Sequence, residues 1–463
     1  MRGFFSVVLA GLLTTGYVFA QSDLFFSDPY TRPVLKLDLP LFDLPYQIDA
    51  MNTVEKGFFS GYANPSMAQS MAVTTDMFSA FHYGMKQFYD TMEWDKFVKE
   101  FIYHGGVMLG YFILTYLPGG DGWLHEEFHR AVMTRFGVNS FNDMNTFPIG
   151  ASMVNVNSIA DEDLIRFKAE SPADFIRMHE AGIEGQYLLI DRLQRNNFFY
   201  DQNFANIYIY LFDTINSHFY VAASGDPAEV DASTDAMNRQ ETGISSRDFT
   251  GFDMTGWVYD LFRPNDPYQN RGVHPSGTGI NRYRKTTDLA KEELAYLQQQ
   301  VYWHFFNYIS PMLIGINKIP LGEDGVYGNF AFRHLLTSFG TDVSVNVFFK
   351  KPPFNLVFIY HNYLNYKYYF PAIEAELIDF PLSLGQLTLY LSPRLLIGMQ
   401  PENQVFKTGN PEFLGLAGCR VDFEVTKYFL PYFDISAKTD GWVAGNEFLN
   451  GNVSIKAGVS ARF

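Results

Sequence analysis

The sequence contains a single cysteine, Cys419, among 463 residues. One thiol cannot form an intramolecular disulfide, so packing, a metal ion or a membrane must stabilise the fold in its place. Basic residues are also few, 34 against 50 acidic ones, which gives a net charge of -16. Such a charge repels phosphate backbones, and we expect no nucleic-acid partner.

Aromatic residues, in contrast, are abundant and make up 17% of the chain. This is more than the core of a soluble enzyme needs, and an aromatic excess beside many strands is typical of the girdles at a membrane interface. The length favours two or three domains over one.

The first twenty residues are predicted to be a secretory signal. Arg2 precedes an apolar run from Phe4 to Leu13, and Ala20 offers a small residue at the cleavage position before Gln21. The run is shorter than the roughly 20 residues that a membrane-spanning helix needs. We therefore expect an exported protein, cleaved after Ala20, in which residues 21–69 form an N-terminal extension.

The most informative motif is His125-Glu126-Glu127-Phe128-His129. Two histidines four residues apart lie on one face of a helix, where both can hold one metal ion, and Glu126 then lies beside a metal-bound water. Asp121 and Gly137 are the predicted start and stop of this helix. With only 10 histidines in the chain, chance is a poor explanation of the spacing.

A catalytic zinc usually takes three protein ligands, so a third residue must come from elsewhere in the chain. A second helix is predicted from 171 to about 196, because Ser171 and Pro172 form a typical helix start. Within it Glu184 is our preferred third ligand, since neighbouring glycines would let the two helices approach closely. Glu180 and His179 are the alternatives.

His125, Glu126 and His129, together with a glutamate on a following helix, resemble the gluzincin group of zinc metallopeptidases. The resemblance implies a Zn²⁺ ion and Glu126 as the general base in peptide-bond hydrolysis. That group usually carries uncharged residues within the motif and just after it, where this chain has Glu127 and Arg130. The alternative is a solvated helix face on which Glu126 and Arg130 form an ion pair.

From about residue 324 the sequence changes to a period of two. In the last segment Val453, Ile455 and Val459 alternate with Ser454 and other polar residues. The alternation alone fits a soluble sandwich or a membrane barrel, but several segments reach the roughly 9 to 11 residues that cross a bilayer at a tilt. Eight strands are predicted, near 326–335, 340–350, 354–363, 368–379, 384–398, 413–426, 430–439 and 451–463.

The chain ends at Phe463, on the apolar face of its last predicted strand. In this, and in its alternation and aromatic content, it resembles bacterial outer-membrane β-barrel proteins. The resemblance implies an outer-membrane location, contact with lipid, and recognition of Phe463 by the barrel assembly machinery.

The sequence thus predicts an α+β protein, with a helical zincin-like metal-binding domain over 70–320 and an antiparallel membrane barrel of about eight strands over 321–463. The expected function is zinc-dependent hydrolysis of peptides or proteins. A non-enzymatic outer-membrane binding or assembly protein, with a structural metal or none, is the alternative; a soluble secreted peptidase is a third. Residues 101–117 are expected to be a buried helix, and 222–285 mainly loop.

Overall fold

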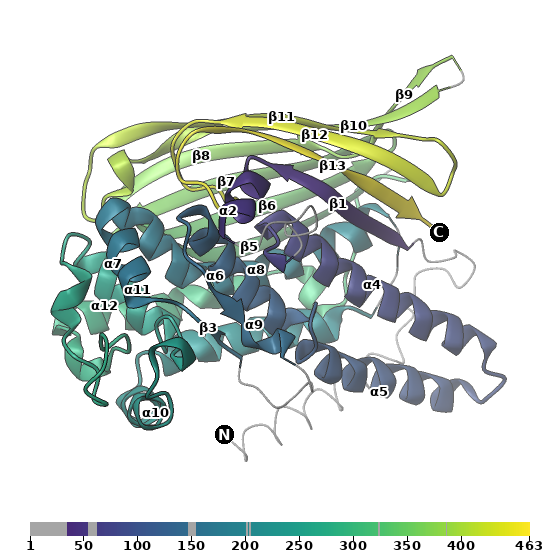
Figure 1. Ribbon diagram of the computed structural model, residues 1–463. Helices are drawn as coiled ribbons and strands as arrows, with labels where there is room; N and C mark the ends of the chain where they lie inside the picture. Colours follow the sequence, from purple (N-terminus) through teal and green to yellow (C-terminus); the bar gives the residue numbers. More distant parts are fainter. Residues whose placement is uncertain are drawn as a thin grey trace.

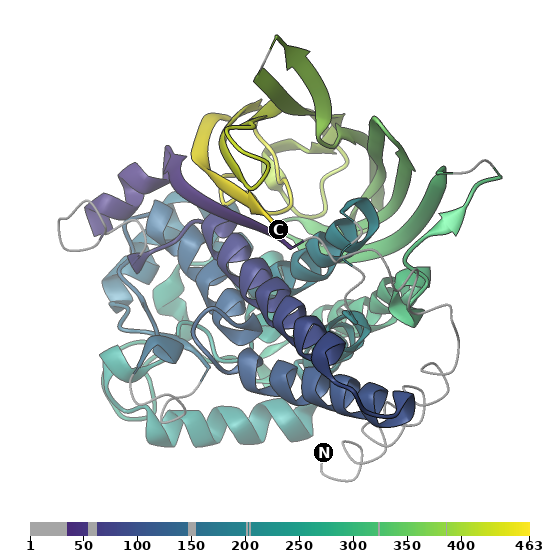
Figure 2. The same cartoon turned by 90° about the vertical axis from the view of Figure 1, so that its right-hand side faces the viewer.

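The computed structural model describes residues 35–53, 63–146, 154–200, 202, 205–322, 325–385 and 387–463. The predicted signal segment lies outside these residues. One large antiparallel sheet arches over a group of helices, and Figure 2 shows the arch from its end, with the helices on the concave side. The protein is therefore of mixed helix and sheet, as predicted.

All eight predicted strands are present, with ends that shift by a few residues. Three further strands join the same sheet: one from the N-terminal extension and two short ones. The strands are β1 (Lys36–Leu44), β4 (Ile319–Pro320), β5 (Tyr327–Thr337), β6 (Gly340–Lys351), β7 (Phe354–Asn365), β8 (Tyr368–Leu377), β9 (Phe380–Leu384), β10 (Leu387–Pro401), β11 (Pro411–Phe423), β12 (Phe429–Lys438) and β13 (Asn452–Arg462).

The sheet is open. Its strand order is β1-β13-β12-β11-β10-β8-β7-β6-β5-β4, with β9 paired to β10, and within the described residues β1 and β4 are not paired with each other. A closed barrel is therefore not confirmed. The helix α4 (Met67–Thr91) runs along β1, where a closing strand would lie, and its Asp76 carboxylate accepts a hydrogen bond from the backbone N–H of Asp38 at 2.9 Å.

In the described part of the chain, ten α-helices pack beneath the sheet. Besides α4 they are α2 (Tyr46–Thr53), α5 (Lys96–Thr115), α6 (Asp121–Arg135), α7 (Asp161–Glu170), α8 (Pro172–Phe199), α9 (Ile207–Ala223), α10 (Pro227–Gln240), α11 (Asp253–Phe262) and α12 (Lys291–Trp303). The long helix α8 is almost wholly buried and lies between α6 and the concave side of the sheet (Figure 1). It therefore connects the predicted metal site with the strands.

Charged contacts join α8 to the sheet. Arg195 binds Glu376 of β8 at 2.7 Å, and Arg192 binds Asp38 of β1 at 2.9 Å. A cavity of about 330 Å³, lined by these side chains and by Arg394 and Arg420, lies between the helix and the strands. The concave side of the sheet thus holds the helices through ion pairs as well as through apolar side chains such as Phe348, Val357 and Leu396, which belong to the shared core.

Three local expectations need correction. Helix α5 was expected in the core, yet Phe101 and Leu109 are 67% and 63% exposed, because only one side of α5 packs on α4 and α9. The segment expected to be mainly loop contains α10 and α11. The N-cap of α6 is Gly120, and Asp121 is instead its first helical residue. None of the helices in the described part of the chain is both long and apolar enough to cross a membrane.

Candidate metal centre

The two motif histidines lie one turn apart on α6 and face the same point. Their ring centroids are 4.8 Å apart. Nε2 of His125 lies 3.0 Å from Oδ2 of Asp253, and Nε2 of His129 lies 3.3 Å from the same oxygen. One ligand atom from each of these three residues lies within 4.8 Å of the others. The predicted pair is thus brought together, with an aspartate that we did not expect.

Both imidazoles present Nε2 to this point because their Nδ1 atoms are engaged elsewhere. Nδ1 of His129 donates to the backbone carbonyl of Met178, and Nδ1 of His125 donates to Oε1 of Gln186 at 3.4 Å. Metal-binding histidines commonly donate their second ring nitrogen in this way, which fixes the tautomer and the ring orientation. The Nε2 atom of each imidazole is thereby left to face the carboxylate of Asp253.

The Gln186 amide is itself held in place. Its Nε2 donates to the carboxylate of Asp121 at 3.2 Å, and its Oε1 accepts from the hydroxyl of Ser217 at 3.1 Å. These two bonds fix which end of the amide faces His125. Gln186 on α8 therefore orients His125 through a chain of contacts that begins at the start of α6.

Helix α8 comes close enough to touch the imidazoles because it has a glycine there. A Cβ at Gly182 would lie 2.4 Å from Nε2 of His125 and 2.4 Å from Nε2 of His129. No side-chain carbon can occupy that position, so a residue larger than glycine would push the helices apart or displace the rings. The close approach that the small residues predicted is confirmed.

Asp253 is the first residue of α11 and is held by Tyr220 of α9. The Tyr220 hydroxyl donates to Oδ2 of Asp253 at 3.0 Å and accepts from its backbone N–H at 3.1 Å. The carboxylate is buried, which by itself raises its pKa, but the charge of His129 and the hydrogen bonds from both imidazoles outweigh this and hold the pKa below its ordinary value. Asp253 is therefore an anion at neutral pH.

The pKa of the His129 imidazole is shifted in the opposite direction, upward. Burial disfavours its cation, yet the adjacent Asp253 charge and hydrogen bond raise the pKa of His129 to about 9. The pair thus stabilises a positive charge between the two side chains. A divalent cation in place of that proton would meet the same electrostatic preference.

The donor set fits a tetrahedral zinc site. Ligands about 2.0 to 2.2 Å from a tetrahedral ion lie about 3.3 to 3.6 Å from one another. The two nitrogen to oxygen distances, 3.0 and 3.3 Å, are close to that range. Two imidazoles and one carboxylate also form a common catalytic zinc set with a fourth position left for water.

Glu126 lines the same cavity as His125 and Asp253. The cavity has a volume of about 270 Å³, and its walls include Tyr220 and Phe249. Burial raises the pKa of Glu126 well above its ordinary value, and the nearby carboxylates Asp248 and Asp253 raise it further. Glu126 thus lies where a water in this cavity could come within its reach.

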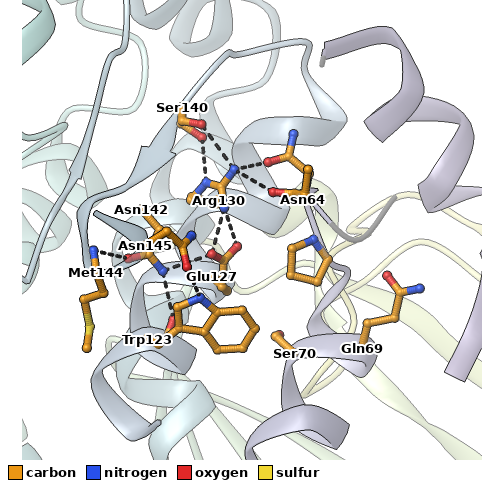
Figure 3. Close-up of polar contacts among 12 residues, drawn as sticks. Asn64, Gln69, Ser70, Trp123, Glu127, Arg130, Ser140, Asn142, Met144 and Asn145 are labelled. Carbon is orange, nitrogen blue, oxygen red and sulfur yellow. Dashed lines mark hydrogen bonds and ion pairs between the residues drawn. The ribbon is translucent and has the colours of Figure 1, made fainter. Parts of the chain in front are cut away.

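The charged residues that depart from the gluzincin pattern form a separate, closed network. Figure 3 shows the contacts of Arg130 with Glu127, Asn64 and Ser140. The Arg130 guanidinium donates to Glu127 at 2.6 Å, and the amide of Asn142 donates to the same carboxylate at 2.9 Å. Arg130 and Glu127 are both buried. The alternative of a solvated face with a Glu126–Arg130 ion pair is therefore wrong, since Arg130 pairs with Glu127 within the core.

The structure places the expected third ligand, Glu184, against another partner. Its carboxylate pairs with Arg177 and accepts from the backbone N–H of Gly445. The alternative Glu180 also binds Arg177, and His179 binds Asp260 at 2.9 Å. All three side chains are thus engaged in buried contacts of their own, away from the two motif imidazoles.

Sequence reasoning missed Asp253. It stands 128 positions after His125, in a Gly- and Asp-rich stretch that the sequence marked as loop, and no spacing rule links it to the motif. Its only sequence signal is its place at the start of a short amphipathic helix, where an acidic residue complements the helix dipole.

Comparisons of the chain with protein-family models, with curated proteins and with solved structures gave no match in any of the three. The chemistry of the site must therefore be argued from its own residues.

Proposed function

We propose that this chain is a zinc-dependent hydrolase of peptide bonds, in which His125, His129 and Asp253 hold the ion and Glu126 acts as general base. One observation carries the proposal: two Nε2 atoms and one carboxylate oxygen converge, while the Nδ1 atoms are held by Met178 and Gln186. Asp253 takes the place that we expected for Glu184.

A bound zinc ion supplies a Lewis acid that lowers the pKa of its water toward roughly 7. Side chains of the protein carry out the proton transfers and orient the ligands. Glu126, inside the same cavity, accepts the proton of the attacking water and later passes it to the leaving amine. Tyr220 fixes the orientation of Asp253, and the buried surroundings keep bulk water from competing for these hydrogen bonds.

We further propose that the enzyme is located in the bacterial outer membrane and that the barrel assembly machinery recognises Phe463. The support is the long antiparallel strands, the aromatic content and the predicted export signal. The side chain of Phe463 is exposed, although its backbone bonds to Leu35 next to β1, so the aromatic ring is accessible to a partner.

The test uses the purified full chain and its Glu126→Gln variant. Metal analysis is expected to find about one zinc per chain in both proteins, while only the wild type cleaves a denatured casein. Glu162→Gln, an exposed acid on α7, is the matched control and should cleave like the wild type. Zinc in both proteins without cleavage of any peptide would instead support the binding or assembly protein, and absence of zinc would overturn the metal site.

A further inference from the structure

The convex face of the sheet is apolar from one side to the other. On strands β6 to β13 and on β1, the side chains that point away from the helices are apolar or aromatic at nearly every position, and Lys351 at the end of β6 is the one charged residue among them. Many are exposed; six examples are Phe358, Ile373, Leu395, Ile397, Phe433 and Ile435.

The register shows that this surface is continuous. Outward residues pair with outward residues across each ladder, as in Phe358 with Val347, Ile373 with Ile397, and Phe433 with Ala457. The charged residues of these strands, such as Asp434, instead point inward, and several form ion pairs with one another or with α8. A sheet in water places its more apolar side against the core and its polar side outward, whereas here the outward side is the more uniformly apolar one and the charged residues face inward.

Both ends of the open sheet are sealed by helical parts of the chain. At β1, the Asp38 backbone N–H donates to Asp76 of α4, and Gln69 of α4 donates to the carbonyl of Pro40. At β5, the side chain of Asn307 bonds both the N–H and the carbonyl of His334, at 2.7 and 3.0 Å.

A further bond at the β5 end comes from backbone. The N–H of Phe332 donates to the carbonyl of Ile309 at 2.9 Å. Residues 304–309 therefore cover one end of the sheet as α4 covers the other. An unpaired strand edge would otherwise offer free N–H and C=O groups, which in hydrocarbon cost several kcal/mol each.

We propose that this convex face contacts the hydrocarbon core of a lipid bilayer, and that α4 and residues 304–309 form the seam that lets an open sheet reside there without closing into a barrel. Strands of 12 to 15 residues, such as β6, β7 and β10, are long enough to cross the hydrocarbon layer at a tilt. The helical half occupies the concave side and takes the place of further strands.

Lipid fits this face better than a second copy of the chain does. The apolar surface extends over eight successive strands, from β1 to β6 in the sheet order, and is convex, as Figure 2 shows, so a second rigid copy could cover only part of it. Ordinary protein interfaces bury only about 800 Å² on each partner. Hydrocarbon chains adapt to a curved surface and can cover it completely.

The sole cysteine offers a direct test, because Cys419 lies on β11 at an outward position, opposite Pro393 and Ile435. The full chain is spin-labelled at Cys419 and reconstituted into vesicles of phosphatidylethanolamine and phosphatidylglycerol. We expect the label to collide readily with oxygen and to be protected from a water-soluble nickel complex. A control protein, Cys419→Ser with Lys427→Cys in the β11–β12 turn, should give the reverse pattern.

Two results would overturn the proposal. One is equal access of the nickel complex to both label positions. The other is a soluble dimer, formed without detergent, in which the Cys419 label is protected from both oxygen and the nickel complex. In that case a second copy of the chain would cover the face. Neither readout uses zinc or peptide cleavage, so a failure of the hydrolase assignment would leave this test unaffected.

Discussion

Gly182 of α8 lies directly against the imidazole of His129 on α6, so closely that a Cβ on the glycine would be 2.4 Å from Nε2. The contact leaves no room for a side chain at Gly182, so the proposed metal centre should be sensitive to a single added methyl group.

Gly182→Ala is therefore expected to disrupt the metal centre. The methyl group must displace one or both rings, and overpacking of this kind costs about 1 to 3 kcal/mol of unfolding free energy. Zinc affinity, measured by competition with a chromophoric chelator, should fall at least about tenfold. Gly84→Ala in α4 is the matched control, because no atom lies within 4 Å of its added Cβ, and it should bind zinc normally.

The third ligand can be assigned by comparing Asp253→Asn with Glu184→Gln. The first removes the carboxylate beside both imidazoles, so zinc affinity should fall at least about tenfold while the fold persists. The second leaves Arg177 with one partner fewer in the core, so the unfolding free energy should fall, by about 3 to 5 kcal/mol for a buried pair, while folded protein still binds zinc. If zinc affinity instead fell in Glu184→Gln and stayed unchanged in Asp253→Asn, Glu184 would be the third ligand.

Gln186→Leu tests the orienting role of the α8 amide. Without Oε1, the Nδ1–H of His125 loses its acceptor and the ring is free to turn, although the side chain keeps a similar volume. Loss of such a partner typically lowers metal affinity or activity by about 10- to 100-fold. Gln186→Glu should recover part of the affinity because it restores an acceptor. An unchanged zinc affinity in Gln186→Leu would contradict the assignment.

The parts of this molecule that the sequence predicted are those determined by local periodicity. The helix around His125 and His129 follows from a spacing of four, and the eight long strands follow from strict alternation. Both signals lie within a dozen residues, so they can be read without knowing what packs against them.

The parts that it did not predict depend on contacts between distant segments. Asp253 reaches the imidazoles only because α11 folds back on α6, and β1 joins β13 from the opposite end of the chain. Alternation indicates that a strand has two faces, but not which strand pairs with it. The two open edges of the sheet therefore could not be predicted from the sequence. Helix α5 was expected in the core because apolar residues alone do not reveal whether anything covers them.

Asp76→Ala tests the seam at β1. The substitution leaves the buried N–H of Asp38 without its acceptor, which should lower the unfolding free energy by about 1 to 3 kcal/mol. Asp76→Asn should lose less, since the amide oxygen can still accept. Asp90→Ala, on the same helix in a half-exposed pair with Lys86, is the control and should cost less than about 1 kcal/mol. Denaturant titration in detergent micelles measures all three.

His82 of α4 makes a contribution to stability that should be lost on acidification. Burial lowers the pKa of His82 to about 3. In the unfolded chain the histidine has its ordinary pKa of about 6.5. Between about pH 6.5 and pH 3 the unfolded chain therefore binds a proton at this residue that the folded protein does not bind. The stability that is present above about pH 6.5 is lost as the pH falls toward 3. For this group alone the loss between pH 7 and pH 5 is about 2 kcal/mol.

His82→Leu removes the titrating group while keeping an apolar side chain of similar size in the same position. The variant should therefore show a smaller decrease of the unfolding free energy between pH 7 and pH 5 than the wild type, by about the amount assigned to His82. Denaturant titrations of both proteins at the two pH values give the comparison directly. Equal pH dependence in the two proteins would mean that His82 takes up its proton without unfolding, through an opening of α4 that lets water reach the ring.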